Sequence, residues 1–77
     1  MTTYNGHKNW NYWNVSLWIN NDEELYNLAR DCIREARNRR HAAALFCAYM
    51  DSGQRFKTPD GARYSLSAVR AAISSME

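Results

Sequence analysis

Five arginines and one histidine between residues 30 and 41 are the side chains best suited to binding chemistry. Four of them recur at the spacing of one helix face, namely Arg30, Arg34, Arg37 and His41. Guanidinium groups on one face offer planar forks of donors to phosphates or to clustered carboxylates. The alternative is a solvated helix face with local ion pairs, Asp31–Arg34 and Glu35–Arg39. The residues predicted to contact a partner are Arg30, Arg34, Arg37, Arg39, Arg40, His41 and Trp18.

Trp18 belongs to a cluster of three tryptophans, with Trp10 and Trp13. Large rings can fill the core of a small domain, and they are also preferred anchors of binding surfaces. A chain of 77 residues must commit most of its rings to folding, which favours the core. Trp13 and Trp18 are five residues apart and cannot point the same way on one helix. Trp18 therefore remains a candidate contact for a partner protein or a nucleic-acid base.

Few residues are placed for catalysis. Neither His7 nor His41 has a Ser, Cys or carboxylate at motif spacing, and the sequence holds no Gly-rich phosphate loop or catalytic acid pair. Cys32 and Cys47 form no CxxC pair and lack zinc-motif spacing to the histidines, so we expect free, buried thiols. The sequence predicts no enzyme, no metal and no cofactor. A Cys–His nucleophile that joins Cys47 to His41 stays open.

Positive charge is local in this chain. The formal net charge is only +2, and residues 1–24 carry one Lys against three acidic residues. Residues 30–40, in contrast, carry five Arg against two acidic residues. Such a patch can steer an anionic partner even when the whole chain is nearly neutral. An acidic protein surface fits better than nucleic acid, because nucleic-acid-binding proteins usually carry a larger positive excess.

The composition is that of a small globular domain. Hydrophobic residues make up 45% and charged residues 23%, too few charges for a disordered chain. The N-terminus has no apolar segment typical of a signal peptide. The longest apolar run, residues 42–50, is far shorter than the roughly 18–20 residues that a membrane span requires. We expect one domain over residues 1–77, in the cytoplasm and away from membranes.

Hydrophobic spacing predicts an all-α fold, a small bundle of about four helices with one long loop around residues 52–64. Residues 1–9 form an irregular lead-in with a turn at Asn5-Gly6. Residues 10–20 fit a short buried helix, and a strand is the alternative. Asn21 is the expected N-cap of the second helix, with acidic residues following in its first turn.

The apolar pattern of the second helix fails near Asn38, where continuation would turn arginines inward. A third helix is expected from about residue 40 to 51, ended by Ser52-Gly53. The turn sequence Thr58-Pro59-Asp60-Gly61 follows, and Ser65 caps a fourth helix. The inward positions predicted for these three helices are Leu25, Leu28, Ala29, Cys32, Ile33 and Ala36; Ala42, Leu45, Phe46, Tyr49 and Met50; Leu66, Val69, Ala72, Ile73 and Met76.

The first third of the chain carries a specific pattern of Trp and Asn. Its elements are Tyr4-Asn5-Gly6, Asn9, Trp13-Asn14-Val15, Leu17-Trp18-Ile19, Asn21-Asp22-Glu23 and Leu25-Tyr26. This pattern resembles the opening of a family of small proteins of unknown function found mainly in bacteriophages and their bacterial hosts. The sequence departs from it at His7, where the family usually has Trp, and at Tyr12, where it usually has Thr. Beyond residue 26, only the Thr-Pro-Asp-Gly turn resembles the family.

The resemblance implies a biological context. Small phage proteins without enzymatic activity are often inhibitors of host machinery, and defence systems such as CRISPR complexes are a frequent target. We therefore expect a phage-type inhibitor that binds a host protein or ribonucleoprotein through the basic helix face. Two alternatives remain, a nucleic-acid-binding accessory protein and a self-associating structural or housekeeping phage protein.

Overall fold

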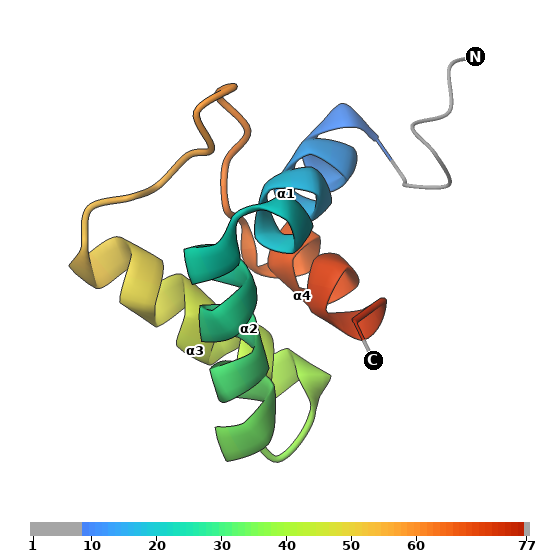
Figure 1. Cartoon of the computed structure of the whole chain (residues 1–77), viewed down its shortest axis with the longest axis vertical. Coiled ribbons are helices and arrows are strands. Elements are labelled where there is room, and N and C mark those ends of the chain that lie inside the picture. Colours follow the sequence, from blue (N-terminus) through green and yellow to red (C-terminus); the bar gives the residue numbers. More distant parts are fainter. Residues whose placement is uncertain (1–8, 77) are drawn as a thin grey trace.

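The computed structural model describes residues 9–76 and places four helices there (Figure 1). The helices are α1 (Trp10–Asn21), α2 (Glu23–Glu35), α3 (Arg39–Ser52) and α4 (Leu66–Ser74). α1 packs on α2 and α4, and α3 packs on the same two helices from the other side. The predicted all-α bundle with one long loop is confirmed. The predicted Asn5-Gly6 turn lies outside the described residues.

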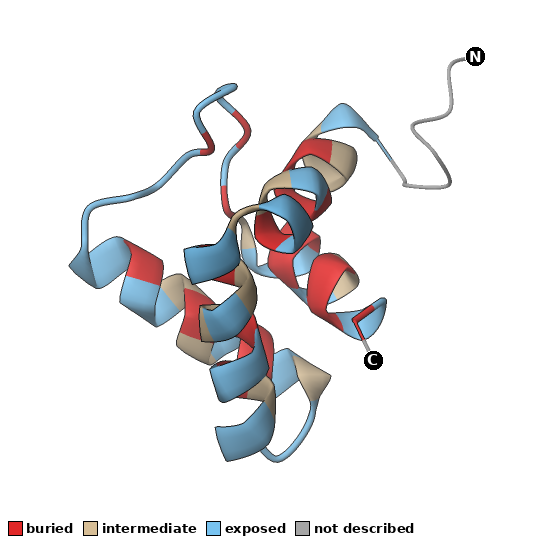
Figure 2. Cartoon of the chain, in the orientation of Figure 1, coloured by how far each residue is buried: buried red, intermediate tan, exposed pale blue. Residues whose placement is uncertain are grey.

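The core lies where the inner faces of the four helices meet (Figure 2). Its largest fully buried side chains are Phe46, Ile19, Leu25, Ile73, Val15 and Val69. The ring of Phe46 packs against that of Tyr64, with centroids 6.1 Å apart. Of the predicted inward positions, Tyr49 and Leu66 are wrong, since 54% and 43% of their surfaces are exposed. The buried stripes on α3 and α4 are narrower than the spacing suggests, because two helices alone cover each of them.

Residues 10–20 form a helix, so the strand alternative is wrong. Asn9 starts α1, because its side chain accepts a hydrogen bond from the Tyr12 N–H at 3.0 Å. The buried face of α1 consists of Asn14, Val15, Ser16 and Ile19. None of the three tryptophans is fully buried, and Trp18 packs against the core from its rim. The small and aliphatic residues of α1 let it approach its neighbours closely, which leaves the indole rings at the edges.

The junction between α1 and α2 differs from the prediction by one residue. Asn21 is the last residue of α1, and its side chain donates to the Leu17 carbonyl. The N-cap of α2 is Asp22, which accepts from the Leu25 N–H at 3.0 Å. Both residues are good caps by type, and the ionised carboxylate of Asp22 also complements the helix dipole.

α3 ends in a tight cap that places a non-glycine residue in the left-handed region. Gln54 has φ 58° and donates its N–H to the Asp51 carbonyl, while Arg55 donates to the Met50 carbonyl. This is the Schellman pattern, in which the left-handed position usually holds Gly. Here the glycine stands one residue earlier, at Gly53.

Gln54→Gly is therefore expected to stabilise the fold. Glycine adopts this φ without the steric cost that a side chain carries, which amounts to about 1 kcal/mol here. Urea denaturation followed by circular dichroism measures the difference. Gly53→Ala serves as the control, since a Cβ at that position meets only atoms at ordinary contact distance; we expect a change within about 0.5 kcal/mol.

Candidate binding surfaces

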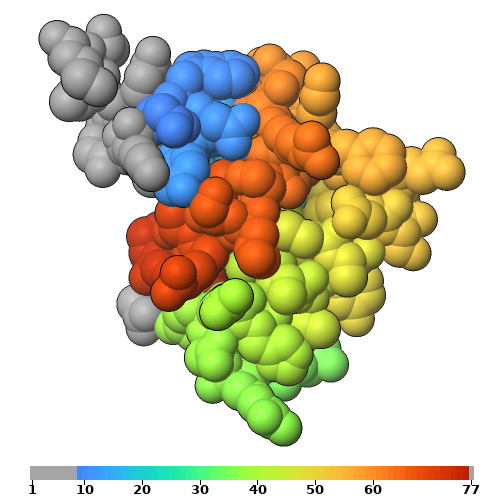
Figure 3. Space-filling view, turned by 180° about the vertical axis from the view of Figure 1, so that it is seen from behind, coloured from blue at the N-terminus to red at the C-terminus, as the bar shows by residue number. Residues whose placement is uncertain are grey.

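The arginines predicted to bind a partner gather at one end of the molecule. We call this surface the basic tip; it consists of Arg30, Arg34, Arg37, Arg39, Arg40 and His41. All but Arg39, which is half-buried, are exposed. The segments that hold them form the lower end of the molecule in the view from behind, and the long loop lies at the upper right (Figure 3). The tip combines the last turns of α2, the link 36–38 and the first turn of α3.

The link between α2 and α3 is closed by polar contacts. Asn38 caps α3, since its side chain accepts from the His41 N–H at 2.8 Å. His41 in turn accepts from the Arg37 N–H through Nδ1 at 3.2 Å. The imidazole therefore ties the link to the start of α3, a local role that the spacing of charges did not predict.

Two arginines of the tip are engaged by neighbours on α2. The guanidinium of Arg30 lies 5.8 Å from the ring centroid of Tyr26 and donates to its hydroxyl at 3.3 Å. Arg34 forms an ion pair with Asp31, which confirms that predicted pair. The guanidinium groups of Arg37 and Arg40 make no ion pair with any residue in 9–76. These two groups are the most available charges for an external partner.

A hollow of about 240 Å³ opens among the arginines of the tip. Arg30, Arg34 and Arg39 surround it, and the apolar side chains of Ile33 and Met76 contribute to its wall. A hollow lined by both arginines and apolar side chains suits an acidic side chain flanked by a hydrophobic one.

The tip differs from the single helix face that the spacing predicted. α2 ends at Glu35, so Arg37 and His41 do not continue the row of Arg30 and Arg34. Trp18 is not part of the tip either. Trp18 is in the last part of α1, beside the N-terminal end of α2, whereas the tip includes the C-terminal end of α2. The length of α2, about 20 Å, separates the two ends.

Trp18 instead helps to hold the turn of the long loop, together with Asn14. We call the four residues Asn14, Trp18, Thr58 and Asp60 the turn clamp. The side-chain N–H groups of Asn14 and Trp18 both donate to Oδ2 of Asp60, each at 2.9 Å. The Thr58 hydroxyl donates to Oδ1 of Asn14 at 2.5 Å. Asn14 and Thr58 are buried, so these hydrogen bonds satisfy groups that would otherwise be costly to desolvate.

The two arms of the loop pair on either side of the turn through one isolated antiparallel bridge, and we call this paired segment the loop ribbon. Its centre is an antiparallel bridge between Lys57 and Arg63. Two hydrogen bonds flank the bridge, from the Thr58 N–H to the Ala62 carbonyl (2.7 Å) and from the Tyr64 N–H to the Phe56 carbonyl (3.0 Å). The turn residue Gly61 has φ +98°, the left-handed conformation expected of glycine there.

The clamp explains much of the N-terminal pattern. Asn14 and Trp18 bind the turn, and Asn9 and Asp22 cap helices. These residues of the motif support the fold. Sequence reasoning did not pair the motif with the Thr58–Gly61 turn, because the two are more than forty residues apart. The signal that could have done so is that the N-terminal motif and the Thr-Pro-Asp-Gly turn both contribute to the resemblance noted from the sequence.

Asp60 makes the clamp sensitive to acid. Hydrogen bonds from Asn14 and then Trp18 lower the pKa of its carboxyl group below the ordinary value. Its ionised form thus stabilises the fold above the unfolded-state pKa of about 3.9, and this contribution is lost as the pH falls through the lower folded value. We expect Asp60→Asn to reduce stability at neutral pH and the deficit to shrink below about pH 4. Urea denaturation of both proteins across this range measures it; a deficit that stays constant with pH would contradict the assignment.

The two cysteines are free thiols. Cys32 is buried, and burial with nearby acidic groups raises its pKa to about 11. Cys47 donates to the Tyr64 carbonyl at 3.7 Å, and burial raises its pKa too. His41 and Cys47 are six residues apart on α3, about 9 Å along the axis and on different faces, so they form no nucleophile pair.

No group of three or more His, Cys, Asp or Glu side chains within residues 9–76 is arranged to hold a metal ion. In the same part of the chain, none of the helices has the length and apolar character needed to cross a bilayer.

Comparison with known proteins gives one match, which covers the whole chain. No curated protein and no solved structure matches the sequence. A family model matches from end to end, residues 1–77. The chain belongs to this family, which is described as a family of unknown function (DUF7249).

Proposed function

We propose that this protein is a non-enzymatic inhibitor of the phage type, which binds a host protein or ribonucleoprotein through the basic tip. The resemblance of its N-terminal third to small phage proteins supports the context, with a defence complex such as a CRISPR effector as the target class. The observation that carries the proposal is the convergence of arginines from α2, the link and α3 on one end of the fold.

The chemistry of the tip supports an acidic or phosphate-bearing partner surface. Arg37 and Arg40 are exposed and without ion pairs among residues 9–76, so a partner need not displace an internal carboxylate to reach them. The first turn of α3 adds the positive end of a helix dipole beside Arg39 and Arg40. The Asn38 and His41 contacts hold the link in place, which lowers the ordering cost of binding.

Capture from bacterial lysate tests the partner class. The tagged protein is incubated with nuclease-treated and untreated lysate, and bound proteins are quantified by mass spectrometry. A protein partner is retained after nuclease treatment. If the untreated lysate yields no defined protein or ribonucleoprotein and capture follows bulk nucleic acid alone, the protein is a nucleic-acid-binding accessory factor and the inhibitor proposal is wrong.

A double charge-reversal variant tests whether the basic tip is the surface that binds the partner. Arg37→Glu with Arg40→Glu removes the two available charges and leaves the Arg34–Asp31 pair intact. Glutamate at position 40 lies in the first turn of α3, where the dipole favours a negative charge, so folding should be preserved. The matched control is Arg63→Glu with Arg70→Glu, which makes the same change of net charge at exposed positions outside the tip. We expect the Arg37→Glu, Arg40→Glu variant to lose binding of the partner and the control variant to keep it.

A further inference from the structure

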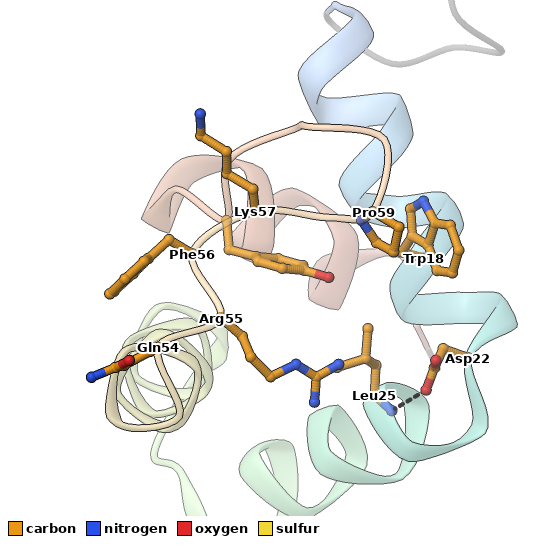
Figure 4. Close-up of a pocket in the computed structure, with 9 residues that line it drawn as sticks. Trp18, Asp22, Leu25, Gln54, Arg55, Phe56, Lys57 and Pro59 are labelled. Carbon is orange, nitrogen blue, oxygen red and sulfur yellow. Dashed lines mark hydrogen bonds between the residues drawn. The ribbon is translucent and has the colours of Figure 1, made fainter.

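A second surface, independent of the basic tip, lies between the long loop and the junction of α1 and α2 (Figure 4). It is a hollow of about 510 Å³, within the size range of ligand sites. Trp18 and Pro59 lie side by side at one end, and Leu25 contributes from α2. Arg55 extends from the loop across the hollow towards α2.

Tyr64 places a hydroxyl without a partner at this hollow. The residue is only 8% exposed, its ring packs against Phe46 in the core, and it lines the hollow. No residue in 9–76 forms a hydrogen bond with its hydroxyl. Burial raises its pKa, with smaller effects from Arg55, which lowers it, and Asp22, which raises it. The hydroxyl is therefore neutral and can donate to a ligand that enters the hollow.

The loop ribbon also has one open edge. Lys57 and Arg63 are opposite each other but do not hydrogen-bond to each other. The N–H and carbonyl of each residue therefore point outward, on opposite edges of the ribbon. The side chain of Asn11 covers the Arg63 edge, since it donates to the Arg63 carbonyl and accepts from its N–H, both at 3.0 Å. The N–H and carbonyl of Lys57 have no partner within residues 9–76.

The open edge borders the hollow. Lys57, whose N–H and carbonyl are unpartnered in residues 9–76, is one of the residues that line the hollow, and its side chain extends away from Arg55 and Pro59 (Figure 4). We propose that the hollow binds an extended acidic peptide segment of a partner protein. The segment adds a strand to the ribbon at Lys57, and its carboxylate binds Arg55 and the hydroxyl of Tyr64.

The contact of Glu24 with Arg55 is an example of how a carboxylate binds at this position. Glu24 binds the Arg55 guanidinium at 3.4 Å. The Arg55 side chain is 49% exposed and the Glu24 side chain 79% exposed. Exposed pairs of this kind are weak and exchangeable, so an incoming carboxylate can replace Glu24. A nucleic-acid strand fits less well, because the N–H and carbonyl of Lys57 at the open edge pair with a peptide backbone and not with a sugar-phosphate chain.

Titration of the full chain with a capped peptide tests the proposal. The probe is acetyl-Thr-Val-Glu-Val-Thr-amide, followed through the backbone amide and indole signals of the ¹⁵N-labelled protein. We expect the largest shifts at residues 54–58 and at the Trp18 indole. The same peptide with Lys in place of Glu should bind at least about tenfold more weakly, a difference of about 1.4 kcal/mol. A peptide with N-methylated valines should not bind, because it cannot pair with a strand edge.

Three substitutions separate the contacts. Tyr64→Phe removes only the hydroxyl and should weaken peptide binding about threefold to tenfold while stability stays the same. Arg55→Gln should weaken it by at least about fivefold, and Glu24→Gln should strengthen it, because the competing carboxylate is gone. Arg63→Gln is the matched control with unchanged affinity.

Several outcomes would overturn the proposal. They are the absence of shifts at millimolar peptide, equal binding of the N-methylated peptide, or unchanged affinity of Tyr64→Phe and Arg55→Gln together. Tighter binding of a short oligothymidine at the same residues would assign the hollow to nucleic acid. Since the basic tip does not touch the hollow, Arg37→Glu with Arg40→Glu should leave peptide binding intact.

Discussion

Phe46→Ala is expected to lower the free energy of unfolding by about 3–5 kcal/mol. Phe46 is fully buried, is the largest of the fully buried side chains, and packs against the ring of Tyr64. A domain of this size has a total stability of only about 4–12 kcal/mol, so the variant loses a large share of it. Urea denaturation followed by circular dichroism at the helix band measures the loss.

Phe56→Ala is the matched control, since the chain has two phenylalanines and the second is 53% exposed. We expect a change within about 0.5 kcal/mol. Equal losses of unfolding free energy for the two variants would contradict the central position of Phe46 in the core.

Asn14→Ala is expected to cost about 2–4 kcal/mol and to release the loop. Asn14 is 1% exposed and bonds to Asp60, a charged acceptor, and to the buried Thr58 hydroxyl. Its removal leaves the Thr58 hydroxyl without an acceptor in a buried place. Hydrogen exchange should accelerate at the amides of Thr58 and Ala62, which are bonded within the ribbon.

Asn20→Ala provides the comparison on the same helix. Asn20 is exposed and its side chain bonds only to Ser16, within α1. Alanine favours the helix, so we expect stability to change by less than about 0.5 kcal/mol and loop exchange to stay the same. If the loop amides of Asn14→Ala exchange as slowly as those of the wild type, the turn clamp does not hold the turn.

The helices were predictable because each has a local signature. Apolar spacing marked the buried face of α2, Ser65 marked the start of α4, and the failing pattern near Asn38 marked the break before α3. The cap of α2 was misplaced because Asn21 and Asp22 are adjacent residues of equally good capping type. Local propensity alone does not decide between them; the extent of α1 does.

The contacts that cross the chain were not predictable in the same way. The turn clamp joins residues near 14 to residues near 60, and only the packing of α1 against the loop brings them together. Trp18 was identified as a contact residue from its ring alone, yet its indole N–H is used inside the fold. The spacing of Arg30 to His41 predicted a single helix face, whereas two helices and the link between them carry these residues.

We propose that Arg37 and Arg40 at the basic tip contact the partner. Calorimetric titration of the captured partner into the wild type and the two charge-reversed pairs tests it most directly. We predict that Arg37→Glu with Arg40→Glu weakens binding by about a hundredfold, roughly tenfold for each lost charge-assisted contact, while Arg63→Glu with Arg70→Glu stays within about twofold. Equal affinity of the two variants, both folded by circular dichroism, would contradict the account.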